Sequence, residues 1–119
     1  MEPWLKSLVY RVETDEGTFV LTGDAGPCQA LDEACRGADV LVMCCAYHGS
    51  IAPEVADVVT GASDAARIGA SSGARAMVLT HTTSGMAGAG RREATVAEVA
   101  RQYDGKLIFA DELTSLDLP

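Results

Sequence analysis

Two short apolar runs constrain the fold of this chain more than any other feature. They are Asp39 to Cys45 (DVLVMCC) and Ala76 to Thr80 (AMVLT). Both are shorter than ordinary helices, and neither shows the alternation of apolar and polar residues that marks a half-exposed strand. Such runs are typical of central strands covered on both faces, as in parallel sheets. The segment between them carries small residues at helical spacing, so we expect a strand, a helix and a parallel strand.

The flanking segments continue this alternation of strands and helices. An alternating segment, Ser7 to Glu13, and a second segment, Thr18 to Thr22, predict a hairpin that turns at Gly17. Further elements are expected at the following places: a helix from Pro27 to Gly37, a short helical turn around 54–59, a helix with Ser63 as N-cap that ends at Gly73, a helix from Arg91 to Tyr103, and strands at Lys106 to Ala110 and Leu113 to Leu118.

The resulting order is β-β-α-β-α-β-α-β-β, which predicts an α/β fold in a single domain over residues 1–119. The sheet is expected to be mixed and parallel in its middle. Three small helices are expected to cover only one of its faces, so the other face would need a partner.

The charge of the chain is strongly acidic, with 17 Asp and Glu against 9 Lys and Arg and a formal net charge of −8. Such a surface repels phosphate backbones and anionic lipids, so we predict no nucleic-acid partner and no membrane docking. A solvated acidic surface is the more common explanation for this composition. No early apolar run has the basic flank of a signal peptide, and no apolar stretch approaches the ~18 residues of a membrane span.

The four cysteines are Cys28, Cys35, Cys44 and Cys45, and they form no CxxC pair. Adjacent Cys44 and Cys45 should point to opposite faces of a strand. Buried free thiols in a reducing cytoplasm are the favoured interpretation, and we predict a cytoplasmic protein.

Asp24 and His81 are the candidate metal ligands, because each directly follows an apolar strand. A carboxylate and an imidazole form a ligand pair that zinc, manganese or iron accepts. A purely structural interpretation is open as well, in which Asp24 caps the helix from Pro27 and His81 hydrogen-bonds within its loop. Cys44 and Cys45 are potential soft ligands, although their strand position favours core packing. His48 is expected to be a surface or loop-anchoring histidine.

The chain also resembles a known family. The segments YRVETDEGTFVLTGDAGPCQAL, GADVLVMCC, GASDAARIGASSGARAMVLTHTT and KLIFADELTSLDL follow one another as in the latter half of metallo-β-lactamase-fold hydrolases. The resemblance is strongest to the subgroup with tRNA 3′-processing endonucleases and arylsulfatases. It rests on the Gly-Asp of GDAGPC and on the Leu-Thr-His that ends a buried strand.

The resemblance implies half of an αββα sandwich, with Asp24 as a metal-bridging carboxylate and His81 as a later histidine ligand. In that family two metals activate a water molecule that attacks an ester, amide or phosphodiester. The family's H-x-H-x-D-H cluster is absent from this sequence, whose only histidines are His48 and His81, and Met43-Cys44 stands where many relatives carry His-Glu. Two ligands do not complete a tetrahedral site.

These departures lead to two expectations. The first is a truncated metallo-β-lactamase-like protein that lacks the full hydrolase activity as a monomer and folds as a homodimer through its uncovered sheet face. The alternative is a metal-dependent hydrolase of phosphodiesters, esters or lactones. Its composite site would form across a dimer or with a separate amino-terminal half, and it would use zinc, manganese or iron.

Overall fold

The computed structural model of the chain describes residues 8–49, 51–81, 90–110 and 115. Its five strands form one sheet in which the spatial order follows the sequence. The strands are β1 (Tyr10–Thr14), β2 (Gly17–Leu21), β3 (Val40–Cys44), β4 (Ala76–Thr80) and β5 (Lys106–Phe109). β1 is antiparallel to β2, and every later neighbour is parallel to the strand before it. The expected mixed sheet with a parallel middle is therefore confirmed.

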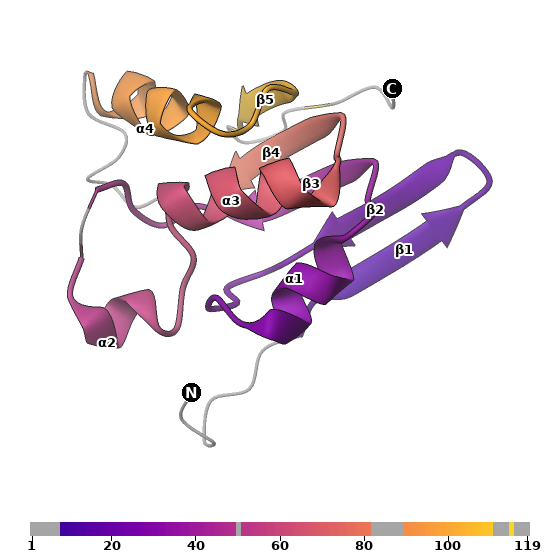
Figure 1. Cartoon of the computed structure of the whole chain (residues 1–119), viewed down its shortest axis with the longest axis horizontal. Coiled ribbons are helices and arrows are strands. Elements are labelled where there is room, and N and C mark those ends of the chain that lie inside the picture. The colour runs from indigo at the N-terminus through magenta and orange to yellow at the C-terminus, as the bar shows by residue number, and fades with distance from the viewer. Residues whose placement is uncertain (1–7, 50, 82–89, 111–114, 116–119) are drawn as a thin grey trace.

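Four helices accompany the sheet: α1 (Gln29–Cys35), α2 (Pro53–Ala56), α3 (Ala62–Ser72) and α4 (Arg91–Ala100). α1, α3 and α4 lie over the same face of the sheet, while α2 lies at the periphery (Figure 1). This follows from the handedness of parallel crossovers. When each right-handed crossover adds a strand on the same side, each helix returns over the same face.

The core fills the space between these helices and the sheet. Leu41 and Met43 of β3 and Met77 and Leu79 of β4 are fully buried there, together with residues of α1 and α3. The small residues of α3 allow the helix to approach the strands closely. A Cβ atom on Gly69 would lie only 2.9 Å from Met77 Cε, so a larger residue there would displace the end of that side chain.

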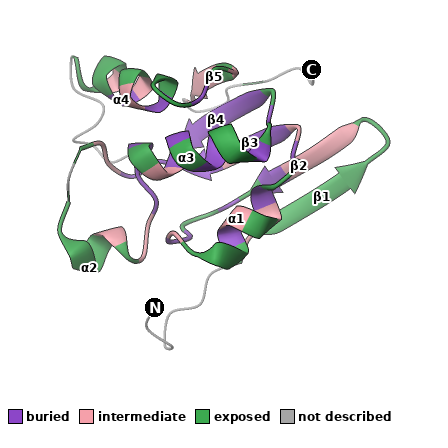
Figure 2. Cartoon of the chain, viewed as in Figure 1, coloured by how far each residue is buried: buried purple, intermediate pink, exposed green. Residues whose placement is uncertain are grey.

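The opposite face of the sheet carries the alternate residues of each strand, and no helix of the described residues covers it. We call it the open face and define it by residues Tyr10, Val12, Phe19, Leu21, Val42, Val78 and Ile108. The edge strand β1 is the most exposed part of this face, whereas β3 and β4 are largely buried (Figure 2). Tyr10 is 61% exposed, and Val12 and Leu21 are each 43% exposed.

Most predicted element boundaries agree with the structure to within a few residues, but the expected N-cap Ser63 is wrong. Gly61 is the N-cap of α3. Its backbone N–H donates a hydrogen bond to the carboxylate of Asp64 at 3.0 Å. The ring of Tyr47 packs against Gly61, where a Cβ atom would lie 2.5 Å from it. This tertiary contact, which no local pattern reveals, places the helix start before Ser63.

Parts of the predicted outline fall outside the described residues. These are the start of the first strand, most of the loop from Ser84 to Gly90, and all but Ser115 of the final strand from Leu113 to Leu118. Among the helices that the structure describes, none has the length and apolar character needed to cross a membrane.

Candidate metal centre

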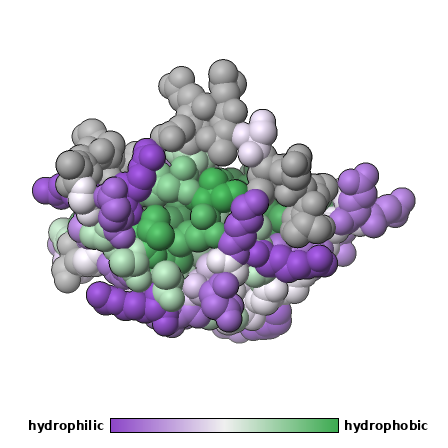
Figure 3. Space-filling view, turned by 90° about the horizontal axis from the view of Figure 1, so that it is seen from above, coloured by the Kyte–Doolittle hydropathy of each residue, from purple (hydrophilic) through white to green (hydrophobic). Residues whose placement is uncertain are grey.

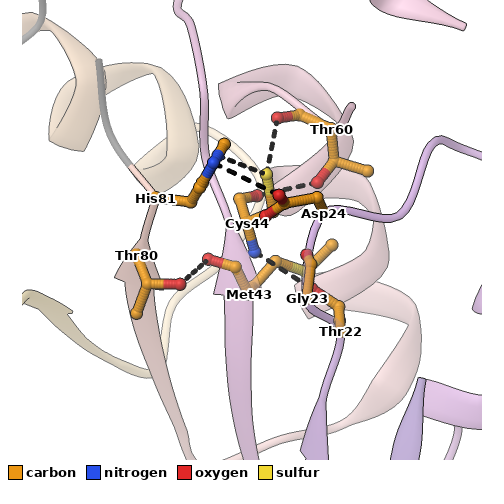
Figure 4. A network of polar contacts seen from close by, with 8 residues as sticks. All are labelled: Thr22, Gly23, Asp24, Met43, Cys44, Thr60, Thr80 and His81. Atoms are coloured by element: carbon orange, nitrogen blue, oxygen red, sulfur yellow. Dashed lines mark hydrogen bonds and ion pairs between the residues drawn. The ribbon is translucent and has the colours of Figure 1, made fainter. Parts of the chain in front are cut away.

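The candidate site lies at the carboxyl ends of β2, β3 and β4. Because these strands are parallel, their ends meet at one edge of the sheet. Asp24 follows β2, Cys44 is the last residue of β3, and His81 follows β4. The three side chains converge on one point (Figure 4). The structure thus brings together both predicted site residues and adds a third.

The contacts within this group are short. His81 Nε2 lies 3.3 Å from Asp24 Oδ2, and His81 Nδ1 lies 3.7 Å from Cys44 Sγ. One donor atom from each residue can be chosen so that all three atoms lie within 4.8 Å of one another. The side chains of Asp24 and His81 are 60% and 51% exposed, whereas Cys44 is buried beneath them.

The backbone is unusual at both ends of the site. His81 has a φ of +54°, and it is the one non-glycine residue with positive φ in the part of the chain that the structure describes. This left-handed conformation costs about 1–2 kcal/mol in a residue with a Cβ atom. Gly23, just before Asp24, adopts the same region with a φ of +58° at no such cost.

Two buried threonines hold the backbone around Cys44. Thr22 Oγ1 accepts a hydrogen bond from the Cys44 N–H at 3.0 Å and donates one to the Gly23 carbonyl at 3.1 Å. Thr60 Oγ1 donates to the Cys44 carbonyl at 2.8 Å, and Cys44 Sγ donates a weak bond to the Thr60 carbonyl at 3.7 Å. The position of the thiol is therefore fixed from both neighbouring loops.

Cys44 is the member of the group that the sequence interpretation named as a potential ligand but assigned to the core. Core packing was favoured for both adjacent cysteines, and this holds for Cys45, which lies in the core cluster under the helices. Cys44 points to the other face, as the alternation predicted, and reaches the site. The signal that could have found it is its place at the end of a parallel strand flanked by the strands that precede Asp24 and His81.

Other sequence expectations are also resolved by the structure. Asp24 does not cap α1, whose N-cap is Cys28 with no side-chain hydrogen bond. Cys28 is exposed, contrary to the expectation of buried thiols, because it precedes the helix; all four cysteines are free. His48 is half-buried in its loop and is not part of the group.

The group allows two kinds of chemistry, a thiol nucleophile or a metal site. A nucleophile requires the thiolate, but burial raises the pKa of the Cys44 thiol, hydrogen bonding to Thr60 lowers it by less, and the charge of Asp24 raises it further. The raised pKa disfavours the thiolate, which makes the Cys44 thiol a poor nucleophile.

The donor set fits a metal ion better than it fits a nucleophile. Thiolate, imidazole and carboxylate are the ligands that zinc binds, and neighbouring ligand atoms around tetrahedral zinc lie about 3.5 Å apart. With one nitrogen of His81 as the ligand, the three donor atoms lie within 4.8 Å of one another, so small side-chain movements would bring them to this spacing. These three residues could hold a single ion.

Comparison with known proteins agrees with this fold. No family model matches the chain. It is 30% identical over 118 residues to ribonuclease Z of Mycolicibacterium paratuberculosis, covering 93% of this chain and 42% of that protein. It is 25% identical over 123 residues to ribonuclease Z of Mycobacterium tuberculosis H37Rv, covering 98% of this chain and 45% of that protein.

A solved structure gives the same answer for the architecture. The metallo-β-lactamase fold protein YhfI from Bacillus subtilis superimposes with a TM-score of 0.70 at 22% identity, over 84% of this chain and 39% of that one. The chain thus spans about half the length of the curated relatives it matches, or less. The expected fold is confirmed: the chain has the metallo-β-lactamase fold, of which it spans one part, and over that part its sequence is similar to ribonuclease Z.

Proposed function

We propose that Asp24 and His81 bind a metal ion, and that this chain forms a complete hydrolytic centre only with donors from a second polypeptide. The observation that carries the proposal is the convergence of both side chains, 3.3 Å apart, at the carboxyl edge of the sheet. The relatives named ribonuclease Z support hydrolysis of a phosphodiester as the reaction of the completed centre. A bound zinc, manganese or iron ion would act there as a Lewis acid and lower the pKa of a bound water.

The described residues alone supply too few ligands for two metals. The group holds one carboxylate, one imidazole and one thiol, and His48 lies outside it. A two-metal site requires several donors for each ion. We therefore infer that the isolated 119-residue chain lacks the full activity of a two-metal hydrolase.

The exposed positions of Asp24 and His81 define what each residue does. Asp24 presents a carboxylate oxygen to solvent, where it can bind a cation and accept a proton from a bound water. The positive φ of His81 turns the chain at the end of β4. Its ring lies between Asp24 and Cys44, so one nitrogen faces each.

The metal content of the purified protein tests this proposal. Untagged wild-type protein should retain stoichiometric metal after dialysis, as measured by plasma mass spectrometry. Asp24→Asn removes the charged ligand without changing its shape and should lose most of the metal. Asp15→Asn, a matched change in the exposed β1–β2 turn, should retain it. Wild-type protein that holds no metal after exposure to zinc, manganese or iron would exclude the site.

The open face suggests where the second polypeptide binds. Tyr10, Val12 and Leu21 are large apolar side chains that remain 43–61% exposed on this face. The side of the molecule seen from above Figure 1, where α4 and β5 lie, also carries a central hydrophobic area with hydrophilic side chains around it (Figure 3). Apolar surface that is gathered rather than scattered marks an interaction site. We propose a second copy of this chain as the partner, because one such face can cover its own copy.

The open face adjoins the metal centre. Cys44 has the same orientation in β3 as Val42, which belongs to the open face, and β3 ends at the site. A partner that covers this face would therefore reach the edge where Asp24 and His81 lie. A copy of the chain could supply the missing donors there, and a separate amino-terminal half of the fold is the alternative partner.

Sedimentation velocity distinguishes these arrangements. The wild-type chain at micromolar concentration should sediment as a dimer, and Val12→Glu should convert it to a folded monomer with an unchanged circular dichroism spectrum. Glu13→Gln changes the charge by one unit on the opposite side of the same strand and should remain dimeric. A wild-type monomer would exclude the homodimer and leave the separate half as the partner to be sought by co-expression.

A further inference from the structure

We propose that Cys44 is the third ligand of this metal ion and that its thiolate makes the site select zinc over manganese and magnesium. The inference rests on the proposed metal site at Asp24 and His81. It goes further in assigning the third donor to this same chain and in stating the class of metal. The juxtaposition that carries it is Cys44 Sγ at 3.7 Å from His81 Nδ1, beneath the Asp24–His81 pair.

The topology explains why these three residues meet. β3 lies between β2 and β4, and Leu21 of β2 pairs with Val42 while Cys44 pairs with Thr80. The last residue of β3 is therefore level with the loops that begin at the ends of its two neighbours. Asp24 and His81 belong to these loops. A ligand at position 44 completes a triangle of donors without any contribution from a distant loop.

The thiol is held in position before any metal arrives. The Cys44 N–H and carbonyl each bond to a buried threonine hydroxyl, at 3.0 Å and 2.8 Å. On binding a metal, the sulfur would exchange its weak 3.7 Å bond to the Thr60 carbonyl and its contact with His81. Ligand sites that are ordered in advance bind more tightly, because less conformational freedom is lost.

The layered exposure of the group fits a site with one open coordination position. Cys44 is buried and forms the floor, while the side chains of Asp24 and His81 are more than half exposed above it. A metal ion arriving from solvent meets these two side chains first. Three protein ligands leave one position of a tetrahedral zinc ion open, for a water or for a donor from the second polypeptide.

The identity of the third donor determines which metal is preferred. A carboxylate with an imidazole binds zinc, manganese and iron alike, whereas a thiolate strongly favours zinc and its soft-ligand analogues cobalt(II) and cadmium. Replacing the sulfur should therefore change the metal preference as well as the affinity.

Cobalt(II) titration of reduced, untagged protein provides a direct test, because a cobalt–thiolate bond gives a near-ultraviolet charge-transfer band. The wild type should develop this band with saturation. Cys44→Ser should lose the band and bind cobalt at least about tenfold more weakly, since loss of an indirect supporting contact alone costs about 10- to 100-fold. Cys45→Ser, which alters the adjacent buried thiol in the core cluster, should keep the band.

A second variant shows whether a loss of binding comes from misfolding, and it tests the preference for zinc over manganese. Cys44→Asp supplies an oxygen donor at the same position and should bind manganese in competition with zinc, whereas excess manganese should not displace zinc from the wild type. If the wild type binds cobalt without the band and Cys44→Ser binds it equally well, Cys44 is not a ligand and the Asp24–His81 site stands. If the wild type binds no metal at all, both proposals fail.

Discussion

At the scale of single residues, the four cysteines occupy three different environments. Cys28 is exposed ahead of α1, Cys44 belongs to the candidate metal centre, and Cys35 and Cys45 are buried in the core. Burial raises the pKa of the Cys35 thiol to about 11 and that of the Cys45 thiol to about 12. Their chemistry should therefore differ widely, because the thiolate is the reactive form.

Alkylation should separate these thiols. At pH 8 the native, metal-free protein should react rapidly with iodoacetamide at Cys28 alone. Cys35 and Cys45 carry fewer than about one thiolate in a thousand at this pH, since both pKa values lie three or more units higher. Mass spectrometry of tryptic peptides gives the extent at each site. Rapid labelling of Cys45 in folded protein would contradict its placement in the core.

Gly26 shows how tightly two loops cross. A Cβ atom at this position would lie 2.2 Å from the backbone carbonyl oxygen of Asp57, which no side-chain movement can relieve. Gly26→Ala should therefore lower the free energy of unfolding by about 3 kcal/mol. Gly49→Ala has open space around it and should cost only about 1 kcal/mol, for its φ of +70°. Urea denaturation of both variants measures the difference.

What the sequence could predict at this scale depended on whether the relevant cause was local. Asp24 and His81 were predictable because each follows an apolar run, and this order places a side chain at a strand end in any parallel sheet. The role of Cys44 was not predictable in this way. The last residue of a buried strand is expected to pack in the core unless the strands beside it in the sheet are known. Two of the three residues of the candidate metal centre could thus be named from the sequence, while their binding of a metal stays a prediction.

At the scale of elements, β2 and β3 are joined by more than their backbone ladder. Beyond the end of β2, the Thr22 N–H donates to the Val42 carbonyl at 3.0 Å, and its hydroxyl accepts the Cys44 N–H. The side chain of Thr22 thus continues the pairing of the strands to the edge where the metal centre lies.

Thr22→Val tests this connection. The variant keeps the shape of the side chain but leaves the buried Cys44 N–H without its acceptor, so it should lower the free energy of unfolding by about 1–3 kcal/mol. Thr95→Val is the matched control, because the buried hydroxyl of Thr95 donates to the carbonyl of Arg91 one turn earlier in α4. Thermal unfolding should show the larger loss for Thr22→Val; equal losses would mean that the Cys44 N–H finds another acceptor.

The elements themselves were the most predictable part of the fold. β4 begins and ends where its apolar run does, and Gly73 ends α3 in the left-handed conformation that favours glycine. The start of α3 was not predictable, because the Tyr47 ring that requires Gly61 belongs to a different segment. Local patterns determine elements, whereas tertiary contacts adjust their ends.

At the scale of the whole molecule, the apolar open face favours association of two copies of the chain, and the acidic net charge opposes it. Each copy carries a formal charge of −8, so two copies repel one another while their apolar faces attract. Composition gave the charge, but it could not show that Tyr10, Val12 and Leu21 remain exposed together, because this depends on which face the helices cover.

The balance between apolar attraction and charge repulsion predicts how salt affects the proposed dimer. Raising the ionic strength from about 0.01 M to about 0.15 M shortens the screening length from about 30 Å to about 8 Å and weakens the repulsion between copies. The dimer should therefore become tighter, as measured by sedimentation equilibrium at the two ionic strengths. Dissociation by salt would instead indicate an interface held by charge pairs rather than by the open face.

The order of the strands has a consequence for the way the protein forms. Since every strand pairs with its predecessor in the sequence, a chain emerging from the ribosome can extend the sheet one strand at a time, with no strand inserted between two others. The hairpin and β3 bring Asp24 and Cys44 together early, but His81 joins them only when β4 docks. During synthesis, capture of a metal ion by all three residues would therefore report that the fourth strand has folded, before β5 is complete.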